Sequence, residues 1–329
     1  MIENSLYFIV FLSLGIYLIL DSIFTGSGIL MLIERSSRKN RDSIIVANIP
    51  FWDQNRTWLV FAGVLLWACF PLAYSKMVQA LFAPIILMVL GFAVQIASFE
   101  MRNKWKKHTD KIDIFFGVSS LVVAISHGIM MSFIVGAFAM QTYLVNEYIN
   151  YHIPFTFFCI LLTIISYMLM AMSVLQYKLS ISNVDFCNKM VKLIHRCVNS
   201  IMILVCIIHL SKPIVYIFQT SFYAYIFTIA FLVVIFISFM IMKSNTCGNR
   251  IKQIIFVVLL FLSFFAGLLF VAYPYIVPIQ DRFYDVITGE KSLFLISTSI
   301  ISFIIIVARL FVNNHKIFNV VDPNMLNDY

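Results

Sequence analysis

Residues 5–33 read SLYFIVFLSLGIYLILDSIFTGSGILMLI, a run that contains one carboxylate and no basic side chain. A helix that crosses the hydrocarbon core of a bilayer needs about 20 mostly apolar residues, so this run is long enough to span a membrane. Its length, and the lack of a basic flank before it, are untypical of a cleaved signal peptide. We therefore expect a first transmembrane helix that is retained in the protein.

Eight further apolar runs of comparable length follow this first one. The chain of 329 residues is 62% hydrophobic and only 12% charged, with a mean hydropathy of +0.96, whereas a soluble domain is about 45–50% apolar and about 25% charged. We predict an all-α polytopic membrane protein with about nine transmembrane helices, in which residues 1–329 form a single membrane domain. The nine runs are 5–33, 57–78, 80–100, 113–138, 155–177, 189–211, 217–242, 253–278 and 292–313.

The basic residues are distributed unevenly between the two sets of connecting loops. Of the 23 Lys and Arg residues, 18 fall in one set and 4 in the other, with Arg196 inside a run and left out of the comparison. Cytoplasmic loops of membrane proteins carry the excess of positive charge, so the N-terminus is predicted in the periplasm and the C-terminus in the cytoplasm. The longest loop, Glu34–Arg56, belongs to the basic set. Because the net charge of +8 is scattered over short loops, it does not favour a nucleic-acid partner.

Several ionisable residues lie inside or beside the predicted helices, toward the cytoplasmic side. They are Asp21, Asp53, Glu100, Arg102 and Asp113. Charged groups at such depths are costly and are functional candidates by default, and acids gathered there suit proton entry from the cytoplasm. Two structural alternatives stay open: Asp53 suits a helix N-cap, and Glu100 with Arg102 suits an ordinary interfacial ion pair.

Histidines in or near the runs favour a structural interpretation. His127, His195 and His209 predict polar contacts between helices rather than haem or metal ligation, because none has a second histidine three or four positions away. No metal site is therefore predicted from them.

Small residues and prolines predict local features of the helices. Gly26 and Gly28 indicate close helix packing. Pro71 and Pro84 are expected to bend or end the second and third helices, because proline lacks a backbone N–H donor.

The most informative motif is the stretch 48–63, which reads NIPFWDQNRTWLVFAG. It resembles the P-x-W-D-G-N-x-x-W-L-V-x-A-G stretch that enters the second helix of subunit II of cytochrome bd quinol oxidases. The similarity continues at 70–74, FPLAY, and at 99–104, FEMRNK, where that family has F-P-x-x-Y and F-E-[FY]-R-x-K. Upstream, YLILD at 17–21 is similar to the family's Y-x-x-x-D. The ordered motifs cover about residues 15–130.

Four positions depart from the family pattern. Gln54 and Ser22 replace glycines, Phe24 replaces a second acidic residue of the first helix, and Gln95 replaces an arginine. Loss of one carboxylate and one arginine together conserves the charge balance. It also weakens any proton route that needs the second acid.

The resemblance implies a fold of two four-helix bundles plus a peripheral helix, in the bacterial cytoplasmic (inner) membrane. It implies a haem-free subunit that supports a haem-bearing subunit I and has no catalytic residue or metal site of its own. Subunit I would carry haems b and d and the quinol site, and the complex would oxidise quinol and reduce dioxygen to water in the respiratory chain. No cofactor is expected in this chain, although a bound quinone or lipid is compatible with it.

The resemblance further implies a route for proton uptake from the cytoplasm. The residues expected on it are Asp21, Trp52, Asp53, Glu100 and Arg102. We expect the three acids among them to lie close together at the inner leaflet. Two alternatives stay open: a proton-coupled secondary transporter, and an oxidase subunit with a purely structural role, which the loss of the second acid and of the arginine favours.

Overall fold

The computed structural model describes residues 2–33, 38–51, 54–140, 153–178, 240, 250–278, 280–289 and 300. The runs predicted at 189–211, 217–242 and 292–313 lie outside these residues apart from Met240 and Ile300, so the expected total of nine spans stays a prediction. Trp52 and Asp53 also lie outside them.

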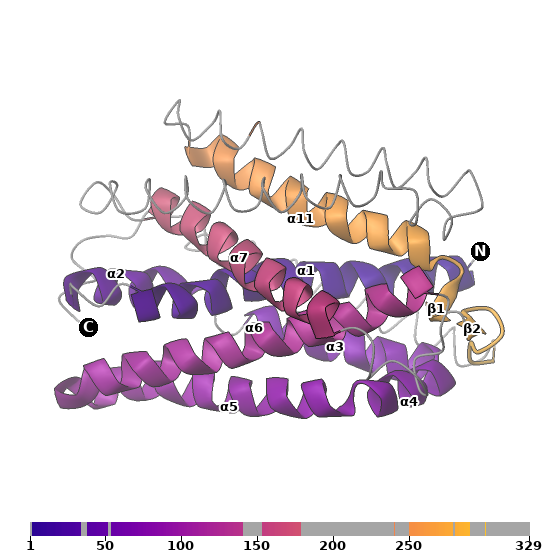
Figure 1. The fold of residues 1–329 in the computed structure, drawn as a ribbon, viewed down its shortest axis with the longest axis horizontal. Coiled ribbons are helices and arrows are strands. Elements are labelled where there is room, and N and C mark those ends of the chain that lie inside the picture. The colour runs from indigo at the N-terminus through magenta and orange to yellow at the C-terminus, as the bar shows by residue number, and fades with distance from the viewer. Residues whose placement is uncertain are drawn as a thin grey trace.

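Long apolar helices dominate the described part of the chain and lie side by side (Figure 1). α1 (Ile2–Ile33) packs against α6 (Thr109–Met140), α7 (Ile153–Lys178) and α3 (Gln54–Cys69). α5 (Phe82–Lys104) packs along α6, and α11 (Arg250–Ala272) lies against α7. The predicted all-α, multi-pass membrane architecture is confirmed. Four of these helices are long and apolar enough to cross a membrane, namely α1 (Ile2–Ile33), α5 (Phe82–Lys104), α6 (Thr109–Met140) and α7 (Ile153–Lys178).

The loop predicted at Glu34–Arg56 contains a short helix, α2 (Arg38–Asn48). Its first half is charged and its second half is apolar, and Ile44, Ile45 and Ala47 are buried in the core of the bundle. A helix this short is marginal by itself, so packing of its apolar half must stabilise it. α2 lies at the end of the bundle opposite the N-terminus, which we call the α2 end (Figure 1).

The run predicted as one helix at 57–78 is divided in two. α3 and α4 (Pro71–Ala80) are separated at Phe70, which has φ −135° and ψ 62°. Proline lacks the N–H that would continue a helix and suits a first turn, so the predicted effect of Pro71 is confirmed. Pro84 lies in the first turn of α5, which begins at Phe82 and continues to Lys104, so the prediction that this proline bends or ends the helix was wrong. A proline is tolerated in the first turn, where the N–H groups have no partner within the helix.

The apolar run predicted as a helix at 253–278 ends early. α11 stops at Ala272, and β1 (Tyr275–Val277) pairs antiparallel with β2 (Asp281–Arg282). The physical reason is Pro274, which cannot donate to a helical ladder. The residues directly after this proline are also apolar, so a prediction based on hydropathy placed the end of the helix too late.

This hairpin is attached to the rest of the bundle by polar contacts. Lys76 Nζ of α4 lies 2.7 Å from Asp281 Oδ2, and the Tyr7 hydroxyl of α1 donates to the Tyr275 carbonyl oxygen at 3.3 Å. The hairpin lies near the N-terminus, at the end of the bundle opposite the α2 end (Figure 1).

Close packing of α1 against its neighbours depends on glycines, as predicted. A Cβ atom added at Gly26 would lie 2.6 Å from the carbonyl carbon of Tyr167 and 2.9 Å from Ala171 Cβ, both on α7. One added at Gly28 would lie 2.7 Å from Ser120 Cβ on α6. These separations are shorter than van der Waals contact, so the glycines permit α1 to approach both helices.

Candidate functional site

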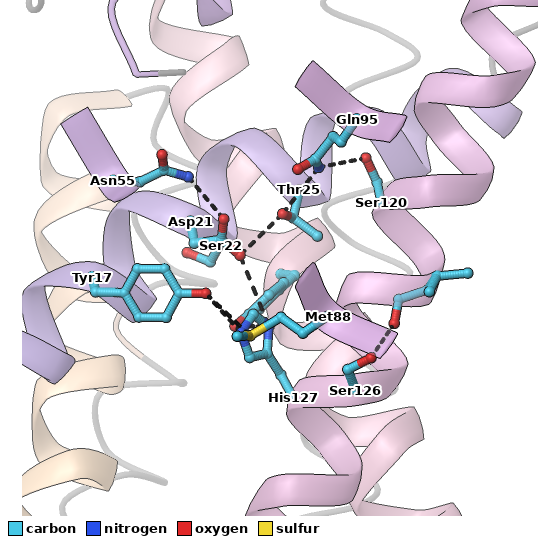
Figure 2. A network of polar contacts seen from close by, with 12 residues as sticks. Tyr17, Asp21, Ser22, Thr25, Asn55, Met88, Gln95, Ser120, Ser126 and His127 are labelled. Carbon is cyan, nitrogen blue, oxygen red and sulfur yellow. Dashed lines mark hydrogen bonds and ion pairs between the residues drawn. The ribbon is translucent and has the colours of Figure 1, made fainter. Parts of the chain in front are cut away.

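The carboxylate of Asp21 is fully buried inside the bundle, at 0% exposure on α1. Its Oδ1 accepts a hydrogen bond from Asn55 Nδ2 of α3 at 2.8 Å, and its Oδ2 accepts one from Thr25 Oγ1 at 3.0 Å. Both donors are neutral groups, and Figure 2 shows them converging on the carboxylate from two helices. These two neutral donors hold the buried acid in place.

The contacts continue from Thr25 to two further helices. Gln95 Nε2 of α5 lies 3.3 Å from Thr25 Oγ1 and donates to Ser120 Oγ of α6 at 2.8 Å. Arg56 Nη2 of α3 donates to Gln95 Oε1 at 2.9 Å. The side-chain amide of Gln95 therefore connects α1, α3, α5 and α6. We call this set the Asp21 network; it consists of Asp21, Thr25, Asn55, Arg56, Gln95 and Ser120.

Arg56 supplies the positive charge of the Asp21 network. Its guanidinium carbon lies 5.3 Å from the ring centroid of Phe24 and 5.0 Å from that of Phe92, within the range of cation–π attraction. Its Nη1 donates to Asn55 Oδ1 at 3.4 Å, and Asn55 donates to Asp21. The amide of Asn55 thus stands between the cation and the acid.

His127 of α6 lies on the other side of the Asp21 carboxylate. Its Nδ1 is 3.9 Å from Asp21 Oδ2 and 3.2 Å from the Tyr167 hydroxyl of α7, and its Nε2 is 2.7 Å from the Tyr17 hydroxyl of α1. The predicted polar contact between helices is confirmed for this histidine. Both ring nitrogens are within hydrogen-bond distance of tyrosine hydroxyls.

A second group of charges lies at the α2 end, and we call it the arginine–aspartate cluster. Arg102 Nε lies 2.6 Å from Asp113 Oδ1 and Arg102 Nη2 lies 2.7 Å from Asp42 Oδ1. Arg41 Nε lies 2.8 Å from Asp113 Oδ2, and Arg41 also pairs with Asp110. The cluster fastens α2 to the end of α5 and the beginning of α6. Its members are Arg41, Asp42, Arg102, Asp110 and Asp113.

The residues predicted for a proton route are placed in three different settings. Asp21 is in the bundle core, Arg102 is in the arginine–aspartate cluster, and Glu100 is exposed on α5. Glu100 follows Gln95 by five positions, which turns it about 140° away around the helix and about 7.5 Å along it. The structure therefore does not bring Glu100 to Asp21.

Arg102 pairs with Asp42 and Asp113, so the alternative of an ion pair between Glu100 and Arg102 was wrong. Arg102 is only 2% exposed and points into the bundle, where the carboxylates of Asp42 and Asp113 receive it. Residues two apart on a helix face different directions, which explains why Glu100 does not share this environment.

Several members of the site were not found from the sequence. Asn55, Thr25, Tyr17 and Tyr167 carry no charge at neutral pH, and each has a common structural role in helices. One signal was present: Tyr17, Asp21 and Thr25 recur every four positions, and residues at this spacing share a helix face.

A family profile with the description "Cytochrome bd terminal oxidase subunit II" matches residues 2–318. The chain belongs to this family. Membership in the cytochrome bd oxidase subunit II family confirms the resemblance drawn from the motifs in residues 15–130 and extends it over nearly the whole chain.

Individual relatives of this subunit II chain are distant. It is 28% identical over 167 residues to cytochrome bd-I ubiquinol oxidase subunit 2 of Escherichia coli (strain K12), covering 47% of this chain and 42% of that protein. It is 33% identical over 73 residues to cytochrome bd ubiquinol oxidase subunit 2 of Bacillus subtilis (strain 168), covering 21% of each. The chain thus aligns with less than half the length of these relatives.

The fold is similar to a chain in the structure of bd oxidase from Geobacillus thermodenitrificans. The TM-score is 0.77, at 16% sequence identity, over 95% of this chain and 99% of that chain. At this identity the likeness shows a shared fold.

Proposed function

We propose that this chain is the haem-free subunit II of a cytochrome bd-type quinol oxidase in the bacterial respiratory chain. It packs beside a haem-bearing subunit I, which holds haems b and d, and the complex oxidises quinol and reduces dioxygen to water. Membership in the subunit II family supports this proposal, as does the fold it shares with a chain of a bd oxidase.

The proposed orientation in the cytoplasmic membrane places the α2 end in the cytoplasm and the hairpin in the periplasm. The α2 end carries Arg41, Arg102, Lys104 and Lys178, whereas Lys76 is near the hairpin. This distribution agrees with the excess of positive charge on the cytoplasmic side of membrane proteins.

Proton uptake is the part of the function to which this chain contributes its own chemistry. Asp21 is the proton-carrying acid, and the observation that supports this role is its complete burial among neutral donors. Protons approach from the cytoplasm by way of Trp52 and Asp53, which precede α3 and hence Asn55 in the chain. Glu100 on its exposed face and Arg102 in its ion pairs act at the entrance.

Replacement of Asp21 by asparagine in the complete oxidase tests the proposal. Asp21→Asn keeps the shape but cannot carry a proton. Its amide oxygen can accept from Asn55, and its NH2 group can donate to Thr25 Oγ1 once that hydroxyl turns away. Positioned proton-transfer groups contribute about 10²–10⁴-fold to rates, so quinol-driven oxygen consumption per haem should fall at least about tenfold. Asp285→Asn, on the exposed hairpin turn, is the matched control and should leave the rate unchanged.

Haem content separates loss of proton transfer from loss of assembly. Reduced-minus-oxidised haem bands should be the same in Asp21→Asn, Asp285→Asn and the unmodified oxidase. If Asp21→Asn and Asp53→Asn both leave oxygen consumption and membrane potential unchanged, the chain has only a structural role in the complex.

A further inference from the structure

His127 is a buried titratable group that proton uptake through Asp21 does not itself require. It lies at the junction of α1, α6 and α7, only 6% exposed, and both nitrogens of its ring are within hydrogen-bond distance of a tyrosine hydroxyl. In Figure 2, dashed lines join its ring to the Tyr17 hydroxyl and to the Asp21 carboxylate. Partners on both nitrogens are usual for a buried imidazole; the feature that calls for explanation is the buried Asp21 carboxylate 3.9 Å from Nδ1 of the same ring.

The partners of His127 suit either neutral form of the imidazole. With the proton on Nδ1, that N–H faces Asp21 and Tyr167, and Nε2 accepts from the Tyr17 hydroxyl. With the proton on Nε2, that N–H donates to the Tyr17 oxygen, and the Tyr167 hydroxyl donates to Nδ1. The Tyr17 hydroxyl can then turn to Met88 Sδ, 4.0 Å away. The two forms differ in which ring nitrogen carries the proton, and rotation of the Tyr17 and Tyr167 hydroxyls satisfies either form, so the ring need not turn when one nitrogen gains a proton and the other loses one.

We infer that His127 and Asp21 form one proton-holding pair inside the bilayer. The inference rests on the proposed role of Asp21 in proton uptake. The proton leaves the Asp21 carboxyl at Oδ2 and joins His127 Nδ1, which gives a carboxylate facing an imidazolium, and it returns by the reverse step. The 3.9 Å between these atoms exceeds a hydrogen bond; a shift below about 1 Å or one bridging water would close it.

The surroundings of the pair contain few other titratable or charged groups. Tyr17 from α1 and Tyr167 from α7 face the histidine, and Arg56 from α3 reaches the acid through Asn55. α5 contributes uncharged groups only. These are Met88 beside Tyr17, Phe92 beside the ring of His127, and Gln95 beside Thr25. The described groups therefore leave Asp21 as the acid that faces His127.

Infrared difference spectra recorded against pH on the complete oxidase test the pair. Asp21→Asn identifies the carboxyl band, and His127→Gln removes the imidazole while an amide fills its place. Two groups coupled by more than about one pK unit titrate together in two macroscopic steps. The Asp21 band should therefore titrate in two steps in the unmodified oxidase and in a single step in His127→Gln. His108→Gln, an exposed histidine beyond α5, is the matched control and should keep two steps.

One result overturns the pair: an Asp21 band that titrates in a single step with the same midpoint in the unmodified oxidase and in His127→Gln. Because spectra at equilibrium need no turnover, this result is independent of whether Asp21→Asn slows oxygen consumption. If His127→Gln does not assemble, Tyr17→Phe provides the second variant. It keeps the ring, removes the partner of Nε2, and should change the imidazole bands together with the two steps of the Asp21 band.

Discussion

The Asp21 network and the centre of the arginine–aspartate cluster, formed by Arg41, Arg102 and Asp113, both contain a buried carboxylate, but the direct partners of the two carboxylates differ. In the cluster, each carboxylate meets a guanidinium, and Asp113 meets two of them. In the network, Asp21 is held by an amide and a hydroxyl, and Arg56 reaches it through Asn55. Matched charges in direct contact fix a structure, whereas an acid whose direct hydrogen-bond donors are neutral can change its protonation without breaking a direct ion pair. We therefore expect the arginine–aspartate cluster to stabilise the α2 end, and Asp21 to carry out the chemistry in the bundle core.

Removing a guanidinium from the cluster should have the largest effect on stability. Arg102→Leu leaves Asp42 and Asp113 without that partner, and breaking a buried ion pair costs about 3–5 kcal/mol. The thermal melting temperature of the purified oxidase measures the loss. Lys104→Leu, exposed at the end of the same helix, should change stability by less than about 0.5 kcal/mol. Equal effects of the two changes would contradict a clamping role for the cluster.

The same change, aspartate to asparagine, can be made in the arginine–aspartate cluster and in the Asp21 network, and its effects on stability can be compared. Asp113→Asn removes the charge that two arginines share and should cost about 2–3 kcal/mol, because hydrogen bonds to charged groups are worth about 1.5–3 kcal/mol each. Asp21→Asn keeps its neutral partners and should cost about 1 kcal/mol or less. Oxygen consumption per haem should show the reverse order. The comparison fails if Asp21→Asn destabilises the oxidase as much as Asp113→Asn.

The planar guanidinium of Arg56 should be worth more than its charge alone. Arg56→Lys keeps the charge but loses the fork that contacts Asn55 and Gln95 from between two aromatic rings, and should lower stability by about 1 kcal/mol. Melting of the oxidase followed by tryptophan fluorescence measures it. Arg38→Lys on the exposed side of α2 is the control. An unchanged melting temperature in both would show that only the charge at this position matters.

The smallest effect is expected at the hairpin end. Lys76 has a side chain 34% exposed in its pair with Asp281, and exposed ion pairs contribute about 0–1 kcal/mol. Lys76→Gln should therefore leave global melting almost unchanged and increase proteolytic cleavage at the hairpin. Lys252→Gln, exposed on α11, should not alter cleavage there. A large fall in the melting temperature would place this contact beside the cluster in importance.

The sequence predicted the features that depend on hydropathy and missed those that depend on contacts between segments. α1, α5, α6 and α7 follow their apolar runs closely, because each run must satisfy its own backbone in lipid. α2 was missed, since its ends are polar and it is held by contacts with distant segments, namely the packing of Ile44 and Ile45 and the ion pairs of Arg41 and Asp42. The end of α11 was placed too late, because the residues after Pro274 remain apolar.

The candidate site was also predicted only in part: the buried acid was identified, but its partners on other helices were not. Asp21 was identified because a carboxylate in a membrane helix is costly, and this argument needs no knowledge of its neighbours. Its partners Asn55 and His127 depend on how α3 and α6 are rotated about their axes, which one sequence does not determine. The proximity expected between Asp21 and Glu100 failed for this reason.

The central position of α1 has a consequence for how the protein is made. Synthesis proceeds from the N-terminus, so α1 emerges before every helix that packs on it. Asp21 enters the lipid before α3 and its Asn55, 34 positions later, have packed beside it. Insertion of an aspartate at mid-helix costs about 2.5–3.5 kcal/mol, which the long apolar remainder of α1 offsets. α1 is therefore inserted without the hydrogen-bond partners of Asp21 that lie on other helices, and the later helices supply them when they pack against it.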